Sequence, residues 1–443
     1  MNAARKGFRI FAVGSMMVLA LVLFMAGCSK SAGGGTSTNI KADVSLMDFF
    51  VQGEARGPAM ADTLKAFKEK YPNINVTEDA MSGEQYEPKI KTLAASGELP
   101  DVFLMRGTWA SNFSKSGSVN ALDDILSADP TFRDGFVKAA LSNCSYNGKV
   151  YSLPLTIDYN TLVFYNKTIF DKYNLTFPKT WDDLVNVIKV LQSKKVIPIA
   201  LGDKDQWVVP ASYNGLLINK FGGADYVDSL LNKDAKFSDQ PYVDSLKFLV
   251  QLADMKAFNS DFISIDFFQE IALYGQGKAA MLVTGNFAAG TLLQSGTKAV
   301  LDATEVGLWP TMPNEKGNAT TSGGAGWGVS INAKLKGAKR DAAINLMKAM
   351  SGNDWGKRLI EMAGMNPART NVDYDQSKAS VLFNKITAAV KGAIVTPVLD
   401  QVIAPAINDE VVKTTQAVLA KGMTAEEAGK DIQAAKDKVL SGK

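Results

Sequence analysis

The amino-acid sequence predicts an α/β fold, with parallel or mixed sheets covered by helices. Two observations support this prediction: strand-like runs alternate with amphipathic helical segments, and several helical segments have recognisable ends. Residues 44–47 alternate as a strand does, and the apolar residues of 60–71 recur at helical spacing until Pro72 ends the helix. Because residues 74–76 form the next strand, we expect 43–77 to be a strand–helix–strand unit.

The same alternation continues along the chain. A helix over 90–96 leads to a strand at 101–104. Thr180 is expected to begin another helix, because the acidic Asp183 three positions later completes a capping box, and a strand at 196–200 follows it. The last hundred residues are mainly helical. Ligands of open α/β sheets bind beyond the carboxyl ends of the strands, so the loops after strands are where binding residues are expected.

The N-terminus has the pattern of an exported, lipid-anchored protein. Basic residues precede an apolar run over 10–27, which ends in small residues before Cys28. This run is similar to the lipobox of bacterial lipoproteins, with Met25 where leucine is usual. We therefore expect 1–27 to be a signal peptide, and 28–42 to be a lipidated cysteine with a Gly/Ser/Thr-rich flexible tether. The alternative is an uncleaved transmembrane anchor. Either arrangement places the protein outside the cytoplasm, on a membrane.

Composition excludes several classes of protein. The signal segment holds three of the 48 basic residues and no acidic one, so the mature chain has 45 of each sign. A neutral chain argues against nucleic-acid binding and against a polybasic membrane surface. Histidine is absent, which excludes His-based catalytic triads and His-based zinc sites. With Cys28 lipidated, Cys144 has no disulfide partner and is expected to be buried. We expect no metal and no cofactor.

Nine short phrases together resemble a known family. They are YPNI (71–74), ASGELPDV (95–102), LP with VFYNK (153–154 and 163–167), PKTWDDL (178–184), GKAAM (277–281), GNF (285–287), GLWP (307–310), GWGV (326–329) and GMNPA (364–368). In this order they resemble the extracellular solute-binding proteins of bacterial ABC importers, family 1 or maltose-binding type. The family often has tryptophan where this chain has Phe287.

The resemblance implies a periplasmic-binding-protein-like fold, in which two α/β lobes are joined by crossing hinge strands and a ligand cleft lies between them. It implies crossings near 156–161, 306–310 and 325–330. The first lobe would comprise 43–157 plus 310–325, and the second lobe 158–309 plus 326–443. The glycines of 323–328 suit a hinge, or equally a loop where backbone approaches a ligand.

A sugar site needs aromatic rings for stacking on the sugar, with carboxylates, amides and arginine for directional hydrogen bonds. Trp181 and Trp355 are expected to be packing residues, whereas Phe49 and Phe50 suit either a core or a site. The candidate ligand-binding residues are those that follow strands or crossings: Asp48, Glu54, Arg106, Trp109, Asp158, Tyr159, Asp205, Trp207, Asn286, Phe287, Gly324, Trp327 and Arg369.

The sequence therefore predicts a non-enzymatic, monomeric substrate-binding component of an ABC-type carbohydrate importer. It would capture a mono- or oligosaccharide by lobe closure and deliver it to a membrane permease. One alternative keeps the fold but binds a polyamine or a phosphorylated polyol. Another is a carboxylate-based glycosidase, which needs two carboxyl groups about 5–9 Å apart.

Overall fold

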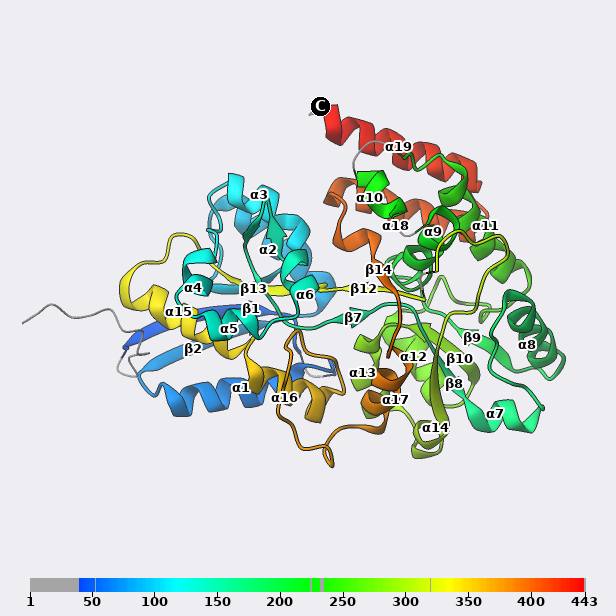
Figure 1. Cartoon of the computed structure of the whole chain (residues 1–443), viewed down its shortest axis with the longest axis horizontal. Helices are drawn as coiled ribbons and strands as arrows, with labels where there is room; N and C mark the ends of the chain where they lie inside the picture. Colours follow the sequence, from blue (N-terminus) through cyan, green and yellow to red (C-terminus); the bar gives the residue numbers. More distant parts are fainter. Residues whose placement is uncertain (1–39, 52, 224, 232–234, 319, 442–443) are drawn as a thin grey trace, which may run out of the picture. The chain divides into compact units, whose positions relative to one another are not determined.

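The computed structural model describes residues 40–51, 53–223, 225–231, 235–318 and 320–441, which belong to one compact unit. The predicted signal segment and Cys28 lie outside the described residues. The described chain forms two lobes, each with its own sheet and its own buried core (Figure 1). None of the helices in these ranges is both long enough and apolar enough to cross a membrane. The predicted α/β class with two lobes is confirmed.

The first lobe surrounds a five-stranded sheet with the order β2-β1-β3-β13-β6. Its strands are β1 (Ala42–Asp48), β2 (Ile74–Ala80), β3 (Val102–Met105), β6 (Leu153–Pro154) and β13 (Gly328–Ile331). β1 runs parallel to β2 and β3, whereas β13 is antiparallel to β3 and β6. The helices are α1 (Gly57–Lys70), α2 (Gly83–Ser96), η1 (Gly107–Trp109), α3 (Ala110–Lys115), α4 (Asp123–Ser127), α5 (Pro130–Asp134), α6 (Lys138–Asn143), α15 (Gly337–Ala349), α16 (Asn353–Arg358) and η4 (Leu359–Ala363), and β4 (Ser145–Tyr146) pairs with β5 (Lys149–Val150).

The second lobe surrounds a four-stranded sheet with the order β11-β8-β10-β9. Its strands are β8 (Leu162–Asn166), β9 (Ile197–Ala200), β10 (Ala279–Thr284) and β11 (Thr304–Leu308). The helices are α7 (Lys167–Lys172), α8 (Trp181–Ser193), η2 (Pro210–Asn214), α9 (Gly215–Gly222), α10 (Tyr226–Leu231), α11 (Gln240–Asp254), α12 (Phe267–Gly275), η3 (Asn286–Ala288), α13 (Ala289–Ser295), α14 (Lys298–Ala303), α17 (Val381–Ala389), η5 (Leu399–Gln401), α18 (Pro405–Leu419) and α19 (Ala425–Ser441). The predicted capping box of Thr180 and Asp183 begins α8.

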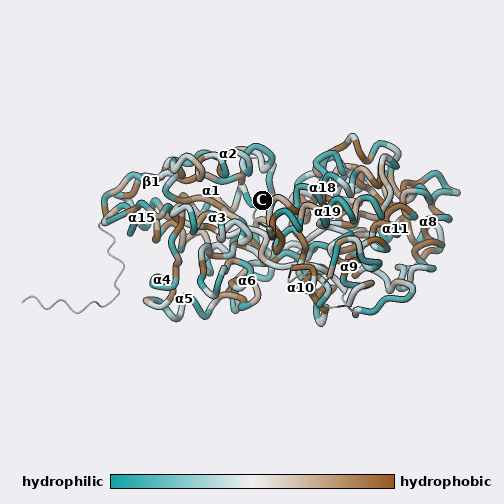
Figure 2. The backbone as a smooth tube through the Cα atoms, turned by 90° about the horizontal axis from the view of Figure 1, so that it is seen from above, coloured by the Kyte–Doolittle hydropathy of each residue, from teal (hydrophilic) through white to brown (hydrophobic). Residues whose placement is uncertain are grey.

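The C-terminal helices complete the second lobe. α18 packs against α19, and both contact α11 (Figure 2). Their buried side chains, among them Val411, Val418 and Ile432, belong to the same core as the four-stranded sheet. These buried side chains of α18 and α19 are therefore part of the second lobe's core.

Three segments pass between the lobes: 155–161, 325–327 and 364–380. The first and second lie side by side, since Leu155 N–H donates to the Trp327 carbonyl at 3.2 Å. A three-stranded sheet with the order β14-β12-β7 lies along these segments (Figure 1). Its strands are β7 (Asp158–Tyr159), β12 (Thr321–Gly324) and β14 (Val395–Pro397).

The packing corrects two of the expected boundaries. The expected crossing near 306–310 is wrong, because β11 forms a continuous ladder with β8 inside the second sheet. The assignment of the segments before and after residue 325 to the two lobes is the reverse of the expected one. Trp309 and Met312 are buried in the second core, so 310–325 packs with the second lobe, whereas 328–363 supplies β13, α15 and α16 to the first lobe.

Residues expected to serve packing are in the two cores. Trp181 is buried in the second core, and Trp355 is completely buried in the first. Phe49 and Phe50 also belong to the first core, although Phe49 reaches the residues between the lobes described below. Cys144 is buried as expected, and burial raises the pKa of its thiol to about 12.

Candidate functional site

Charged and polar side chains from both lobes meet around the first and second crossing segments. We call this group the interlobe cluster; it comprises Asp48, Glu54, Arg56, Arg106, Asp158, Trp327, Asp400 and Gln401. Asp48 ends β1 and Arg106 follows β3, so both lie at the carboxyl ends of parallel strands. Asp400 and Gln401 come from η5 in the second lobe. Ligands of open α/β sheets are expected beyond the carboxyl ends of the strands, and Asp48 and Arg106 lie at that position.

Both arginines of the cluster are paired with acids. Arg106 contacts Asp400 of the other lobe at 3.2 Å and Glu87 of α2 at 3.5 Å, and its guanidinium lies 4.6 Å from the centre of the Trp327 ring. Arg56 contacts Glu54 at 2.6 Å and lies over the ring of Phe49. The cluster therefore has two aromatic-supported arginines whose charge is already balanced.

Several buried acceptors of the cluster remain unpaired. Asp48 Oδ2, Asp158 Oδ1, Asp400 Oδ1 and Gln401 Oε1 have no hydrogen-bond partner among the described residues. Burial raises the pKa of Asp158, while the charge of Arg56 lowers it in part. Burial also raises the pKa of Asp48 to about 7. A buried acceptor without a donor costs about 1–3 kcal/mol, so this group can be stabilised by a solute that brings several donors.

Aromatic rings flank the cluster on the first-lobe side. Trp327 is half-buried and packs edge-to-face against Phe49, Tyr86 and Trp109, with ring centres 4.9, 5.9 and 5.4 Å apart. Trp109 is itself buried in the first core. Trp327 is therefore partly exposed, and the buried Trp109 packs against it.

A second aromatic group lies on the second-lobe side. Trp207 packs against Phe267 at 5.0 Å and against Phe287 at 6.0 Å, and Phe287 also contacts the first core. Beside them, burial and a hydrogen bond with the carboxyl of Glu84 in the first lobe raise the pKa of Asp205 to about 6. Rings and carboxyls from both lobes thus face the same region.

Glycine is required where the second crossing segment passes the cluster. A side chain at Gly324 would meet Gln401 Oε1 at 2.6 Å, and φ is +154° there. A side chain at Gly326 would lie 2.9 Å from Asp158 Oδ2. These close approaches let the backbone of the second crossing segment lie directly against the side chains of Gln401 and Asp158.

The structure separates the predicted site residues into three groups. Asp48, Glu54, Arg106, Asp158, Gly324 and Trp327 lie in or beside the interlobe cluster, and Asp205, Trp207 and Phe287 lie in the second aromatic group. Trp109 lies in the first core against Trp327, and Tyr159, Asn286 and Arg369 lie outside both groups.

The buried amide of Asn286 fastens the first crossing segment. Its Oδ1 accepts from Tyr159 N–H at 2.9 Å, and its Nδ2 donates to the Ile157 carbonyl and to Asn366 Oδ1. Arg369 donates to Asn353 and to the Phe132 carbonyl within the first lobe. The expectation that Asn286 and Arg369 contact ligand is therefore replaced by a structural role for each.

The sequence analysis did not identify Arg56, Asp400, Gln401 and Phe267. Arg56 lies two residues after Glu54, so the sequence alone could have predicted a salt bridge between them. Asp400 and Gln401 follow the three-residue β14 in a mainly helical region, where no strand pattern marks a binding loop. Within the described ranges, no group of three or more Cys, Asp or Glu side chains is arranged to hold a metal ion.

A separate pair of buried acids lies in the second lobe. Glu270 Oε2 accepts from Gly202 N–H at 2.7 Å, whereas Glu270 Oε1 and Asp203 Oδ2 have no partner among the described residues. Burial raises the pKa of Glu270 well above its ordinary value and that of Asp203 to about 7. Both carboxyls are therefore protonated in the folded state over a range where the unfolded chain is ionised.

This pair predicts a pH-dependent stability. Raised pKa values mean that the folded state holds more protons, so the free energy of unfolding should fall as pH rises from about 4 to about 7. Glu270→Gln removes one of these protons and should make the fall shallower, with a higher melting temperature at neutral pH. Calorimetry across this range measures both effects. A steeper fall in the variant would contradict the assignment.

Comparison with known proteins identifies the family of this chain. The model of the family "Bacterial extracellular solute-binding protein" matches residues 52–357. An ABC transporter extracellular-binding protein of Pyrococcus horikoshii is 28% identical over 66% of this chain and 68% of its own length. The multiple sugar-binding protein of Streptococcus mutans is 25% identical over 72% of this chain and 73% of its own.

A solved structure described under xylan utilization by Caldanaerobius polysaccharolyticus has a TM-score of 0.81 and 29% identity, and covers 88% of this chain and 99% of its own. The family model covers well over half of the chain and includes both lobes. Proteins of this family bind solutes and are not enzymes. The chain therefore belongs to the bacterial extracellular solute-binding protein family.

Proposed function

We propose that the chain is the substrate-binding component of a carbohydrate ABC importer. It captures a mono- or oligosaccharide between its lobes and delivers it to a membrane permease. The observation that carries this proposal is the set of buried, unpaired acceptors of Asp48, Asp158, Asp400 and Gln401 beside aromatic rings. Sugar hydroxyls supply the missing donors, and apolar sugar faces stack on Trp327 and Trp207.

The charges of the cluster favour an uncharged ligand over the two alternative solutes. A phosphorylated polyol needs free cations, but Arg56 and Arg106 are each paired with acids. A polyamine needs acidic side chains that are not already paired with a cation. In this cluster Arg56 and Arg106 already pair with acidic side chains. The names of relatives agree: besides the multiple sugar-binding protein, they include a maltodextrin-binding protein of Bacillus subtilis.

We also propose that the protein is exported and anchored by lipid. Support comes from the sequence of residues 1–42, which lie outside the described residues except for 40–42. Residues 1–27 act as the signal, Cys28 receives the lipid, and the residues after it form the tether as far as β1, which begins at Ala42. Mass spectrometry of the membrane-bound protein tests this: an unmodified Cys28 at the mature N-terminus, or an uncleaved signal, contradicts it.

A thermal-shift screen against a carbohydrate panel tests the binding function. Saturating ligand should raise the melting temperature, because ligand binds only the folded state. Trp207→Ala should weaken binding by about 1–3 kcal/mol, roughly a 5- to 150-fold higher Kd, since a stacking ring is lost.

Phe268→Ala is the matched control, because Phe268 is 51% exposed and contacts Phe267 rather than Trp207. It should bind sugar as the unmodified protein does. If no neutral sugar stabilises the protein while a polyamine or a sugar phosphate does, the proposed solute class is wrong. If Trp207→Ala binds normally but melts far lower, the ring is a core residue.

A further inference from the structure

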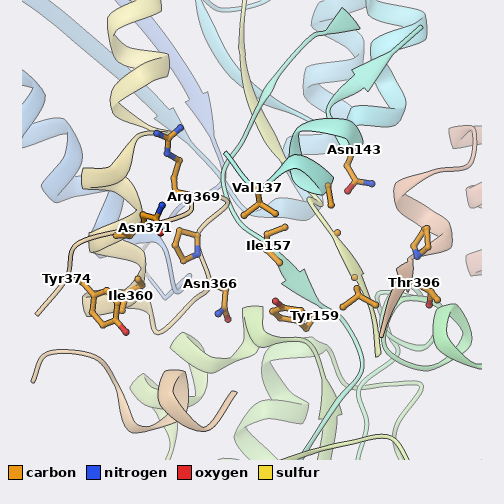
Figure 3. Close-up of a pocket in the computed structure, with 17 residues that line it drawn as sticks. Val137, Asn143, Ile157, Tyr159, Ile360, Asn366, Arg369, Asn371, Tyr374 and Thr396 are labelled. Atoms are coloured by element: carbon orange, nitrogen blue, oxygen red, sulfur yellow. The ribbon is translucent and has the colours of Figure 1, made fainter. Parts of the chain in front are cut away.

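A cavity lies along the crossing segments (Figure 3), and Gly324, which approaches Gln401 of the interlobe cluster, is part of its lining. Its volume is about 590 Å³, which is within the range of small-molecule sites in proteins. Lining residues come from α6, β7, β12, β14, η4 and the third crossing segment. None of the proposed carbohydrate contacts made by Asp158, Trp207 or Trp327 is part of this lining.

Alternation along the first crossing segment separates the two sites. Ile157 and Tyr159 line the cavity, and Figure 3 shows both side chains at its wall. Asp158, between them, faces the other way, because its carboxylate lies against Gly326 and is influenced by Arg56. Successive side chains of an extended strand point to opposite faces, so one strand forms a wall of each site.

The chemistry of the lining indicates an uncharged ligand. The lining includes Val137, Ile360 and Pro397, and its one charged residue is Arg369. The guanidinium of Arg369 is already used, because it donates to Asn353 and to the Phe132 carbonyl and lies 4.3 Å from the Phe136 ring. The cavity therefore combines apolar side chains with neutral amide and hydroxyl groups, and its one guanidinium is already hydrogen-bonded within the protein.

One buried hydroxyl in the lining has no partner. Thr396 is 4% exposed, and its Oγ1 makes no hydrogen bond to the described residues. An unpaired buried hydroxyl is unfavourable unless a ligand or water completes it. Thr396 therefore adds an unpartnered hydroxyl to the neutral polar side chains of the lining, among them Asn143, Asn366 and Asn371.

Occupancy of the cavity is coupled to the positions of the lobes. Val137 and Ile360 belong to elements of the first lobe, whereas Val395 and Pro397 belong to β14, which packs against α9 of the second lobe. A molecule that touches lining residues of both lobes makes all its contacts only when the lobes are arranged as described here. Its binding must therefore favour this arrangement of the lobes.

We propose that this cavity is a second binding site, for an uncharged ring-sized molecule carrying a hydroxyl group, and that its occupancy favours the lobe arrangement described here. The site does not depend on which solute the interlobe cluster binds. By linkage, whatever binds at one site in this arrangement strengthens binding at the other.

Phenol is a suitable probe, with toluene and benzoate as its uncharged and anionic analogues. Binding to the purified protein is measured by saturation-transfer NMR and titration calorimetry. Phenol should bind, and benzoate should bind more weakly because no free cation meets its charge. Ala139→Trp should abolish phenol binding, since Ala139 lines the exposed mouth of the cavity, whereas Ala61→Trp on the exposed face of α1 should not.

Thr396→Val tests the hydroxyl contact. It should weaken phenol binding roughly 2- to 12-fold, the value of one hydrogen bond, and leave toluene binding unchanged. Small-angle scattering should show a smaller radius of gyration with phenol. Phenol binding that survives Ala139→Trp, or no phenol binding at all, overturns the site. Benzoate binding as tight as that of phenol overturns the ligand class, and an unchanged radius overturns the coupling.

Discussion

Replacing Trp355 by alanine should lower the free energy of unfolding by about 3–5 kcal/mol, the loss typical of a large buried aromatic side chain. Trp355 is completely buried, and its ring stacks on Phe50 with the ring centres 5.9 Å apart. Its Nε1 donates to the Leu155 carbonyl at 3.2 Å, which fixes the start of the first crossing segment. Urea unfolding followed by circular dichroism measures the loss.

Trp355→Phe is the matched control, because it keeps most of the ring and removes the N–H donor. It should destabilise the protein less than the alanine variant does, by an amount that includes the unpaired Leu155 carbonyl, about 1–3 kcal/mol. If the alanine variant were within 1 kcal/mol of the unmodified protein, Trp355 would not be the central ring of the first core.

Asp158→Asn should weaken solute binding without weakening the fold. A hydrogen bond to a charged group contributes about 1.5–3 kcal/mol, so Kd should rise roughly 10- to 150-fold. Burial raises the pKa of Asp158, so the ionised carboxylate is unfavourable in the empty protein. The variant should therefore melt at the same temperature as the unmodified protein, or higher, at neutral pH when no ligand is present.

Titration calorimetry with the sugar found in the panel measures the change in binding, and Glu270→Gln is the matched control. Glu270 is also a buried acid with a raised pKa, but it belongs to the second core region near Gly202 rather than to the interlobe cluster. That variant should gain stability and keep its affinity. Normal affinity in Asp158→Asn would remove the carboxylate from the site.

The elements that sequence predicts well are those with local signals. The helix that starts at Thr180 has its cap, and the strand at 101–104 corresponds to the fully buried β3. The lobe to which β13 belongs has no such signal. β12 and β13 are separated by three residues and both are only four residues long, so only tertiary packing decides which sheet each one joins.

The prediction of site residues is limited in the same way, because tertiary packing decides where each side chain points. Position on the first crossing predicted that Asp158 and Tyr159 lie near a ligand, but the direction of each side chain depends on the register of β7 against β12, which the sequence does not contain. Asn286 has the chemistry of a sugar ligand, yet its amide is used up by backbone and side-chain groups of the crossing segments. Asp400 joins the cluster through its contact with Arg106, and these two residues are far apart in the sequence.

The position of β13 between β3 and β6 has a consequence for how the protein is made. β13 begins at Gly328, after the whole four-stranded sheet of the second lobe, yet the five-stranded sheet is not continuous without it. During synthesis from the N-terminus, β6 has no partner in that sheet until the chain has been extended past residue 331. Closing such a long loop is slow, so the first lobe finishes folding late.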